Sequence, residues 1–525
     1  MALDVGASDE QLTDGPPGSD RRDAWPLQDG TSTTYLRWVL PLVIVLFAAG
    51  LRFAYLSHPE RIYFDETYYA ENAAQVLDYG VEASPKVASD PSQGVDPSFV
   101  VHPPVGKWLI AGGIAVFGDN SLGWRVASAV AGTLLVGVTY FIGLRLFRRR
   151  GVSALAAFLL SIEGLALTMS RISMLDGFLA LFVAVGFWCL LIDRDQRWYL
   201  VTAVDAPDAA DAPEDDAARP EASHASGRDV RLPRTPRPHL WLAGVAFGLA
   251  LATKWSAVLA IGGAGLFLLC SELAWRRAVT GRWLRQPVRL AAGGLAALLV
   301  LPALIYVGSY VSWFANYEYT RPGNAVCADR PCEVGPREML RGWFGEQQEI
   351  YRFHRDLEVT HSYRASASNW PVTRRPVVYY YESCSDESDE PCAVEDGHVE
   401  EIVGLGNPAV WWVAVPIYPL LLWAAIRRRD RVAATIAVLL FAQYLPWFVQ
   451  ARPLFFFYAL PMVPLIVLML GWAAGHALRY PAWRWAPAIV GLVALGAFVY
   501  WSPIYYGFQI TENAWRMRML MNSWI

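Results

Sequence analysis

The feature that most constrains this chain is a series of apolar runs, each long enough to cross a lipid bilayer. A helix needs about 20 largely apolar residues to span the hydrocarbon core. Nine such runs are separated by polar or charged segments: residues 36–56, 122–147, 152–169, 174–192, 290–311, 409–426, 432–449, 454–478 and 486–501. The sequence therefore predicts an all-α polytopic membrane protein.

Composition supports this class and excludes another. Hydrophobic residues make up 54% of the chain, which includes 23 Trp, as is typical of many membrane spans. The formal net charge is only -4, whereas nucleic acid binding needs a concentrated basic face. We therefore expect no nucleic acid partner.

A further apolar stretch, residues 240–273, is too long for one ordinary span and contains Lys254 near its middle. Two helices with a turn at Lys254 bring the total to eleven spans. With a cytoplasmic N-terminus, this count places the basic clusters at 148–150, 276–282 and 427–429 on the cytoplasmic side, where Lys and Arg are retained. A single span would put the later clusters on the opposite side from the first.

The eleven spans divide the chain into six parts. Residues 1–34 form a disordered cytoplasmic N-terminus without a removable signal peptide. Residues 35–192 hold helices one to four and a first outer loop at 57–121. Residues 193–238 form a disordered cytoplasmic linker, 239–311 helices five to seven, 312–408 a second outer loop, and 409–525 helices eight to eleven with an outer C-terminal tail. We expect the chain in the plasma membrane.

Cysteine positions agree with this topology, because disulfides persist in oxidising compartments outside the cytosol. The second outer loop contains four cysteines, and three pairings of them are possible. The local pairs require the least loop closure: Cys327 with Cys332, and Cys384 with Cys392. A metal site is the weaker interpretation of the same four residues.

The first outer loop carries two adjacent carboxylates, Asp65 and Glu66, among aromatic residues that suit a membrane interface. This setting suits a general base that accepts a proton from a hydroxyl. The structural alternative is that Asp65 caps the helix that runs through Tyr69 to Leu77.

Two prolines after His102 fix the start of a short apolar stretch, 105–117, which is too short to span and predicts an interfacial or re-entrant helix. His102 and Pro103 are candidates for lining a polar pocket, although a histidine before two prolines is more often structural. Lys107 is a third candidate, and its alternative role is to reach lipid headgroups.

Three basic residues near the outer ends of spans are unusual, because the positive-inside bias disfavours them. These are Arg125, Arg171 and Lys254. An anionic lipid phosphate at the outer interface would supply their counter-charge. The alternative is pairing with local carboxylates, such as Arg171 with Asp176. For Lys254 we favour the phosphate, since no acidic residue is near it in sequence.

Aromatic and polar residues also alternate in the second outer loop, where His361, Tyr363 and Trp370 are candidate pocket residues. Such a mixture suits sugar faces and extended peptides. It equally suits an interfacial aromatic belt.

In combination, seven ordered segments resemble one known family, the protein O-mannosyltransferases, and its actinobacterial-type branch without the inserted repeat domain. The segments are FDETYY, HPPVGKW, RISMLD, LATKWS, HSYRASASNWPVTRRPVVYYY, GNPAVWW and RPLFFFYALP. The resemblance runs from about residue 64 to about residue 461. It implies a GT-C-type glycosyltransferase fold with about eleven transmembrane helices and two large extracytoplasmic loops.

The resemblance also implies an activity: inverting transfer of mannose from polyprenyl phosphate mannose to Ser or Thr of exported proteins, on the extracytoplasmic face. Asp65 would be the base, Glu66 would orient the acceptor or the base, and Lys254 and Arg125 would stabilise the leaving phosphate. No cofactor is required, although the carboxylates and His102 could bind a divalent metal. The lipid donor and the exported polypeptides are the implied partners, and the export machinery is a further candidate.

Two other functions compete with this one. The nearest is a GT-C enzyme that glycosylates a lipid or glycan, which glycosylation of a peptide by the purified protein would distinguish. The more distant is a transporter, which would carry inverted repeats and several charges within its spans. Only Glu163 lies well inside a run, and no repeat is apparent.

Overall fold

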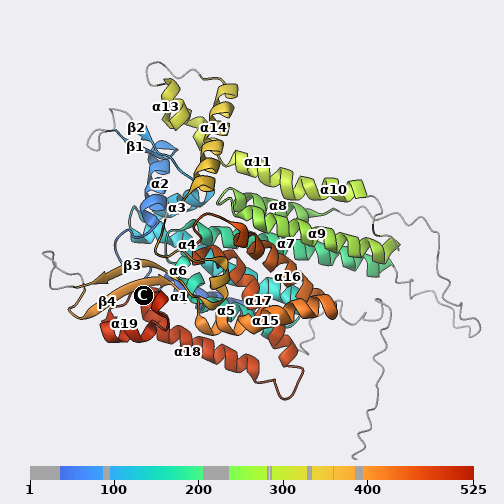
Figure 1. The fold of residues 1–525 in the computed structure, drawn as a ribbon. Helices are drawn as coiled ribbons and strands as arrows, with labels where there is room; N and C mark the ends of the chain where they lie inside the picture. Colours follow the sequence, from blue (N-terminus) through green and yellow to red (C-terminus); the bar gives the residue numbers. More distant parts are fainter. Residues whose placement is uncertain are drawn as a thin grey trace, which may run out of the picture.

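The computed structural model of this chain describes residues 36–86, 95–204, 236–280, 283, 287–327, 334–358, 360–384 and 394–525. In these ranges the longer helices run roughly side by side in one bundle, and the structured loops gather at one end of it (Figure 1). Residues 1–34, expected as a disordered N-terminus, lie outside the described residues.

Within the described ranges, eight helical stretches are long and apolar enough to cross a membrane. They are formed by α4 (Ser121–Phe147), α7 (Leu175–Val204), α9 (Ala257–Thr280), α10 (Pro287–Leu295) with η3 (Ala296–Val300) and α11 (Leu301–Gly308), α15 (Pro408–Arg427), α16 (Arg431–Tyr444) with η6 (Leu445–Val449), η7 (Phe456–Met462) with α17 (Val463–Ala477), and α18 (Ala486–Tyr506). The shorter apolar helices are α1 (Leu36–Phe53), α3 (Val105–Phe117), α5 (Arg150–Ser161) and α8 (Pro238–Leu251). The eleven expected spans correspond to the eight long stretches together with α1, α5 and α8.

The run at 152–169, expected as one span, is two helices. α5 ends at Ser161, and α6 (Gly164–Met169) begins after Glu163. The fully buried Glu163 carboxylate accepts N–H bonds from Ala166 at 2.7 Å, Asn407 at 2.9 Å and the Trp411 indole at 2.9 Å. Glu163 thus caps α6 and ties it to the start of α15, because a buried charge needs such partners.

The expected division of residues 240–273 into two helices is confirmed. α8 ends at Leu251 and α9 begins at Ala257, with Lys254 in the turn between them. The Lys254 ammonium therefore lies beside helix ends rather than within a continuous apolar helix.

The expected start of the cytoplasmic linker at residue 193 is wrong. α7 continues to Val204, and residues 205–235 lie outside the described residues. Buried acidic residues hold this extension against α8 and α9: Asp193 pairs with Arg237 at 2.6 Å, and Glu272 pairs with Arg197 at 3.2 Å. Such pairs allow a charged helix end to pack instead of remaining solvated.

The first loop contains α2 (Glu66–Tyr79), a hairpin of β1 (Ala83–Pro85) and β2 (Val95–Pro97), and α3. The helix expected from Tyr69 to Leu77 lies within α2, and the short helix expected at 105–117 has the bounds of α3. The small sheet is an addition to the expected all-α fold.

The second loop contains α12 (Val311–Ala315), η4 (Tyr317–Tyr319), α13 (Arg321–Cys327), α14 (Pro336–Asp356), η5 (Ala367–Val372), β3 (Val377–Ser383) and β4 (His398–Gly404). The C-terminal tail returns to this loop through β5 (Ile510–Thr511), α19 (Glu512–Arg518) and η8 (Asn522–Trp524), and the antiparallel sheet has the order β3-β4-β5. Val378 pairs with Val403 and Ser383 with Val399, with a bulge after Val378. The loop and the tail therefore lie at the same end of the bundle.

Two cysteines of the second loop, Cys327 at the end of α13 and Cys384 after β3, are disulfide-bonded. Cys332 and Cys392, their expected partners, lie outside the described residues.

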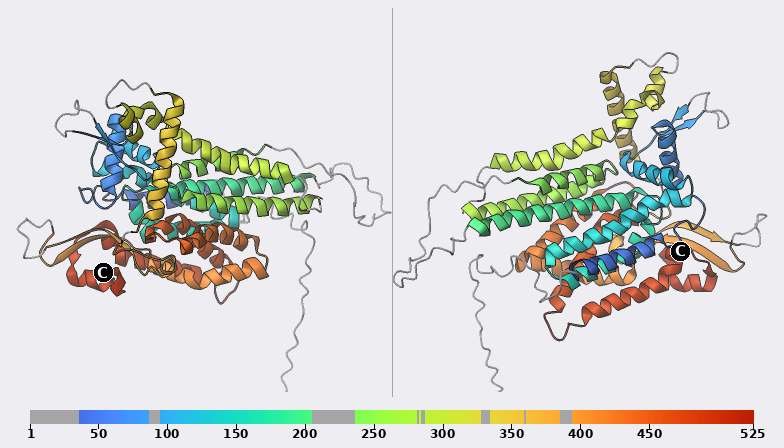
Figure 2. Two further views of the ribbon diagram at one scale, coloured as in Figure 1. Left: turned by 45° about the horizontal axis from the view of Figure 1, so that its top comes forward. Right: turned by 180° about the vertical axis from the view of Figure 1, so that it is seen from behind.

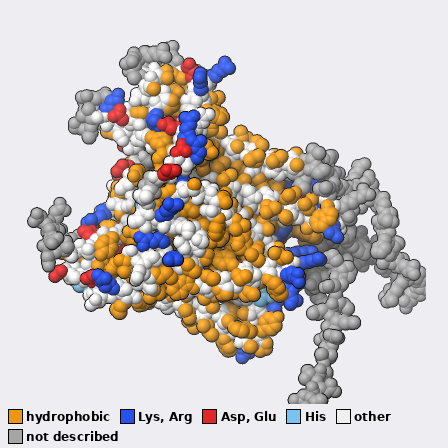
Figure 3. Space-filling view, in the orientation of Figure 1, with side chains coloured by type: hydrophobic (Ala, Val, Ile, Leu, Met, Phe, Trp, Pro, Cys, Tyr) orange, Lys and Arg blue, Asp and Glu red, His pale blue; other side chains and the backbone are white. Residues whose placement is uncertain are grey.

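The bundle has a buried centre and an apolar surface. α7 and α17 lie at the centre, whereas α10, η3 and α11 pack mainly against α8 at the edge (Figure 2). The space-filling view shows hydrophobic side chains over the helices and charged side chains mainly at their ends and on the loops (Figure 3). This distribution is the one expected of a chain with lipid as its lateral solvent.

Candidate active site

The two adjacent carboxylates of the first loop, at the start of α2, have different environments. Phe64 precedes them with a φ of 52°, in the left-handed region that a bulky residue seldom adopts. Its ring packs edge-on against that of Tyr379 in β3, with ring centres 4.8 Å apart, and this contact holds the turn in place. Asp65 is partly exposed, whereas Glu66 is fully buried. The turn thus directs one carboxylate into the protein and leaves the other accessible.

Glu66 forms a buried bidentate ion pair with Arg125 of α4. The Arg125 Nε and Nη2 lie 2.8 and 2.9 Å from the two carboxylate oxygens of Glu66, and the backbone N–H of Ser173 donates to the same carboxylate at 2.9 Å. The remaining Arg125 donors reach carbonyls of the first loop at residues 56, 59 and 61. Arg125 is fully buried with its donors occupied, so it positions Glu66 and the loop and has no donor left for a phosphate.

Arg171, also expected at the phosphate, is engaged in the same way. Its guanidinium donates to the carbonyls of Arg52 at 3.0 Å and Tyr55 at 2.8 Å, and to that of Ala54, and it lies 4.3 Å from the centre of the Tyr506 ring. It therefore fixes the end of α1, and the alternative pairing of Arg171 with Asp176 does not occur.

Asp176, at the start of α7, instead pairs with Lys254 from the turn between α8 and α9. The Lys254 Nζ lies 2.9 and 2.8 Å from the two carboxylate oxygens, and both side chains are largely buried. The ammonium also lies 4.9 Å from the centre of the Tyr458 ring. Lys254 therefore forms an ion pair with a carboxylate, which was the alternative to phosphate binding. Its ammonium has three N–H donors, so it can still bind a further acceptor.

Asp65 lies within electrostatic range of this ion pair. Burial raises the pKa of Asp65 to about 6, while the charge of Lys254 lowers it and that of Asp176 raises it. Its side chain makes no capping hydrogen bond to α2, which contradicts the capping alternative. Asp65 is therefore a carboxylate that can be ionised near neutral pH and is free to accept a proton.

The segment around His102 is packed against Asp176 and Lys254 by a close approach of helices. A Cβ on Gly106, in the first turn of α3, would lie 2.5 Å from a methyl of Leu175 and 3.2 Å from one of Thr253. The N–H of Val105 also donates to the carbonyl of Ala252 at 3.0 Å. Because Gly106 has no side chain, the first loop packs closely against the two helix ends that carry the ion pair.

His102 stacks on a second histidine, His354 of α14, with ring centres 5.5 Å apart. The Arg452 Nη1 donates to His354 Nδ1 at 2.9 Å, and His354 Nε2 lies 3.0 Å from the carbonyl of Val101. Those partners require a neutral ring with its proton on Nε2. Burial lowers the pKa of both histidines. The Nδ1 of His102 is buried without a hydrogen-bond partner among the described residues, so it is available to a ligand.

Arg452 connects this pair to the aromatic segment before α17. Its Nη2 donates to the Tyr458 hydroxyl at 3.0 Å, and its Nε has no hydrogen-bond partner among the residues that the structure describes. Arg452 and Lys254 thus flank Tyr458. Arg452, Tyr458 and His354 are not among the site residues predicted from the sequence, although the segment RPLFFFYALP contains the first two.

Three other residues that were expected to line the pocket are instead buried in contacts within the protein. Lys107 is buried, pairs with Glu82, and donates to the His102 carbonyl at 3.0 Å, so the headgroup alternative does not hold. Pro103 is buried in the turn before α3. Trp370 is buried against Tyr444 and Trp447.

His361 and Tyr363 lie at the surface end of an aromatic series. The His361 ring lies edge-on to Phe455, with ring centres 4.9 Å apart. Phe455 stacks on Phe457 with ring centres 5.5 Å apart, and the ring centre of Phe457 is 6.2 Å from that of Phe64. His361 is exposed and Tyr363 is partly exposed. The series connects these residues to the turn that carries Asp65.

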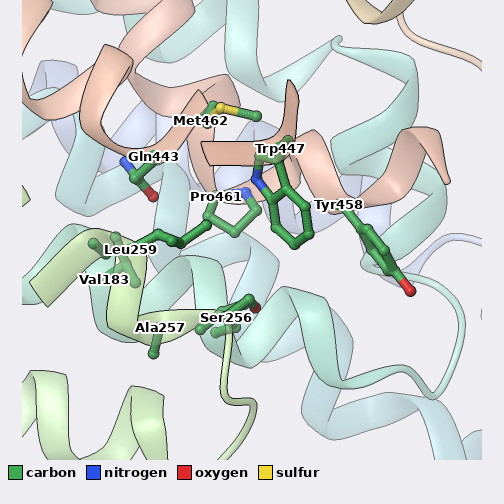
Figure 4. Close-up of a pocket in the computed structure, with 11 residues that line it drawn as sticks. Val183, Ser256, Ala257, Leu259, Gln443, Trp447, Tyr458, Pro461 and Met462 are labelled. Carbon is green, nitrogen blue, oxygen red and sulfur yellow. The ribbon is translucent and has the colours of Figure 1, made fainter. Parts of the chain in front are cut away.

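A largely apolar pocket opens next to the cations. Its empty space, open solvent included, is about 270 Å³. Its lining comes from α7, the turn before α9, α9, α16, η6 and η7: Leu179, Val183, Ser256, Ala257, Leu259, Ala260, Gln443, Trp447, Tyr458, Pro461 and Met462. Tyr458 belongs to both features. Its ring lines the pocket while its hydroxyl points away from the other labelled side chains (Figure 4). Among the described residues, no group of three or more His, Cys, Asp or Glu could hold a metal ion.

Comparisons with known proteins agree with this architecture. Two family models match: the C-terminal four-transmembrane region of protein O-mannosyltransferase over residues 339–524, and dolichyl-phosphate-mannose-protein mannosyltransferase over residues 101–206. The chain is 32% identical to the polyprenol-phosphate-mannose–protein mannosyltransferase of Mycolicibacterium smegmatis (strain MKD8), over 93% of both chains. It is 31% identical to that of Mycobacterium tuberculosis (strain ATCC 25618 / H37Rv), over 93% of this chain and 92% of the relative.

Solved structures share the fold. The protein O-mannosyltransferase Pmt1-Pmt2 complex of S. cerevisiae bound to the sugar donor matches with a TM-score of 0.73 at 13% identity, over 94% of this chain and 93% of that one. ArnT from Cupriavidus metallidurans in the apo state matches with a TM-score of 0.52 at 18% identity, over 90% and 65%.

Proposed function

This chain belongs to the polyprenol-phosphate-mannose protein mannosyltransferases and has their GT-C fold, and we propose that it transfers mannose from a polyprenyl phosphate to Ser or Thr hydroxyls of exported proteins. The transfer is a single displacement that inverts the anomeric carbon and takes place on the extracytoplasmic face. The observation that carries this proposal is an accessible Asp65 carboxylate within electrostatic range of Lys254, whose ammonium lies 4.9 Å from the ring centre of Tyr458, a residue that lines the apolar pocket.

Asp65 is the general base. It accepts the proton of the acceptor hydroxyl as the hydroxyl oxygen attacks the anomeric carbon of mannose. Its pKa of about 6 leaves it ionised at neutral pH yet basic enough to assist proton removal. Glu66, held by Arg125 and the Ser173 N–H, positions Asp65 by fixing the first turn of α2.

Lys254 and Arg452 bind the phosphate of the donor. Both cations contact Tyr458, and each retains donor capacity after its protein contacts. The bond from the anomeric carbon to the phosphate oxygen breaks, and the positive charges stabilise the phosphate that leaves without requiring a proton. This assignment replaces Arg125 and Arg171, whose donors are occupied by carbonyls and Glu66.

The prenyl chain next to the phosphate lies in the apolar pocket. Tyr458 lines that pocket and contacts both cations, so a phosphate between the cations would carry its first isoprene units toward Trp447, Pro461 and Met462. An apolar lining with few polar groups suits an isoprenoid.

The extracytoplasmic position is supported by the ends of the helices. The site lies where α4, α9 and α15 begin, and their opposite ends carry the basic clusters at 148–150, 276–277 and 427–429. Basic ends are retained in the cytoplasm. The disulfide-bonded Cys327 and Cys384 also favour an oxidising compartment for the loops. Contact with the export machinery stays a prediction.

Peptide glycosylation tests the proposal directly. The purified full chain in lipid nanodiscs is incubated with radiolabelled polyprenyl phosphate mannose and a Ser/Thr-rich peptide. We expect label on the peptide, its loss in Asp65→Asn, and its retention in Glu60→Gln, which removes an exposed carboxylate of the same loop. Transfer that is unchanged in Asp65→Asn would remove Asp65 as the base, and label on lipid alone would contradict the protein acceptor.

A further inference from the structure

The helix α14 of the second loop has an unusual surface. One face is buried through Trp343, Glu346 and Ile350. Next to that face lie three exposed large side chains: Leu340 at 49% exposure, Phe344 at 62% and Tyr351 at 57%. At 3.6 residues per turn these three fall within an arc of about 40°, so they form one stripe along the helix.

A row of arginines follows the stripe on its outer side. Arg337, Arg341, Arg352 and Arg355 are exposed and fall within the next part of the helix circumference, between about 60° and 120° from Leu340. The first three form no ion pair within 4 Å among the described residues. An apolar stripe beside unpaired basic residues is the pattern of a helix that lies in the interface of a bilayer with anionic lipids.

The position of α14 in the fold agrees with that pattern. The Tyr306 hydroxyl donates to Gln347 of α14 at 2.5 Å, and the ring of Trp343 lies 6.1 Å from that of Tyr306. Tyr306 is two residues from the end of the candidate span Ala291–Gly308, or about 3 Å along the helix axis. The middle of α14 is therefore level with the end of a spanning helix, where the headgroups begin.

The direction of α14 also agrees with a helix that lies in the bilayer interface. It crosses the ends of α8, α9 and α11, and its first half extends past α11 beyond the bundle (Figures 1 and 2). Leu304, in the neighbouring span, and Val311, just after that span, are also exposed apolar side chains. In Figure 3 the hydrophobic surface of the bundle likewise continues onto the part built by α13 and α14, where Lys and Arg side chains also gather.

From these observations we propose that α14 is a membrane-surface helix, whose Leu340, Phe344 and Tyr351 insert among the lipids beside the bundle while its arginines bind anionic headgroups. The occupant of this surface is the bilayer itself, on the side of the active site. The proposal goes beyond the glycosyltransferase reaction, because it concerns how the second loop is seated.

Depth-dependent quenching of a label on α14 tests the proposal without measuring catalysis. An environment-sensitive fluorophore is attached to Phe344→Cys in the full chain with Cys270→Ser, because Cys270 is an exposed free cysteine. The matched control is Glu338→Cys on the same helix, which is exposed but lies about 120° around from Phe344. Both proteins are placed in vesicles of phosphatidylcholine and phosphatidylglycerol, and an unchanged thermal unfolding temperature verifies the fold.

We expect nitroxide-labelled lipids to quench the label at 344 at least about threefold more strongly than the label at 338, and aqueous iodide to show the reverse order. The combined variant Arg337→Gln, Arg341→Gln, Arg352→Gln should reduce the lipid quenching at 344. Equal accessibility of both labels to iodide would overturn the proposal. A label at 344 that is shielded from iodide and from lipid nitroxides alike would indicate a protein occupant, and would also overturn it.

Discussion

The ammonium of Lys254 lies 2.9 and 2.8 Å from the two carboxylate oxygens of Asp176, a residue 78 positions earlier in the chain. This pair joins the start of α7 to the turn between α8 and α9. It sets the charge around Asp65, because its two members shift the pKa of Asp65 in opposite directions. In the proposed reaction, the pair would therefore link donor binding to the strength of the base.

Activity should depend on pH through Asp65. The base acts in its ionised form, so kcat/KM should be low below pH 6 and rise as the pH passes the pKa of about 6. Asp65→Asn should lower kcat by roughly 10²- to 10⁴-fold, the usual contribution of a general base, and remove this rise. Initial rates of peptide mannosylation between pH 5 and 8 provide the measurement. A wild-type profile that is flat across this range would contradict the assignment.

The variant Asp176→Asn should shift that profile to lower pH. Removing a negative charge near Asp65 makes ionisation of Asp65 easier, so the pKa of Asp65 falls. Lys254→Ala should act in the opposite direction and also raise the KM for the lipid donor, because a phosphate ligand is lost. Glu60→Gln is the control, and an acid limb that moves equally in all three variants would exclude a local electrostatic cause.

Substitution of Arg125 should lower stability, whereas substitution of Arg452 should weaken donor binding. Arg125→Ala leaves the buried Glu66 charge unpaired, which typically costs about 3 to 5 kcal/mol, so the thermal unfolding temperature and the yield should fall. Arg452→Gln should leave the unfolding temperature nearly unchanged and raise the KM for the donor about tenfold or more. The two variants are compared by thermal unfolding in detergent and by donor titration. A stable Arg125→Ala protein with only a raised donor KM would restore Arg125 to the phosphate site.

Glu346 of α14 should make stability depend on pH. Burial raises its pKa from 4.5 to about 7, and one of its carboxylate oxygens has no hydrogen-bond partner among the described residues. Between these values the folded state holds a proton that the unfolded chain releases, so stability falls as the pH rises from about 4.5 to about 7. Glu346→Gln should raise the unfolding temperature by about 2 to 5 °C at pH 8 and change it little at pH 4.5. An equal shift at both pH values would point to packing instead.

Removal of divalent metal should leave transfer unchanged. In the proposed reaction Lys254 and Arg452 supply the positive charge that the leaving phosphate needs, so the proposed steps include no metal ion. Purified enzyme is assayed with excess chelator and again after addition of Mg²⁺ or Mn²⁺. Complete loss of activity that the metal reverses would show that the site requires one.

The positions of the helices were predictable because each depends on local sequence. A run of about 20 apolar residues must be helical in lipid, where no water satisfies the backbone. The same reasoning predicted the turn at Lys254, since a charge in the middle of a long apolar run is costly. Where the prediction was wrong, at Glu163 and at the extension of α7, the reason was a partner distant in sequence.

The site shows the same division. Asp65, His102 and Lys254 were identifiable as polar residues at predicted membrane boundaries. The roles of Arg125 and Arg171 could not be predicted. A basic residue near the end of a span gives the same sequence pattern whether its partner is a lipid phosphate or a set of backbone carbonyls. The place of Arg452 and His354 in the site could not be predicted, because it depends on their contact with each other across 98 residues of sequence.

The sequence by itself determined the membrane class, the helix positions and the family, since hydrophobicity and ordered motifs are properties of local segments. Only the tertiary structure decided which charges are paired. A buried ion is stable with whichever counter-charge the packing brings within about 3 Å. The packing of α7 against α8 brings Asp176 to Lys254, and the packing of the first loop against α4 brings Glu66 to Arg125. That choice leaves Asp65 as the accessible carboxylate of its pair.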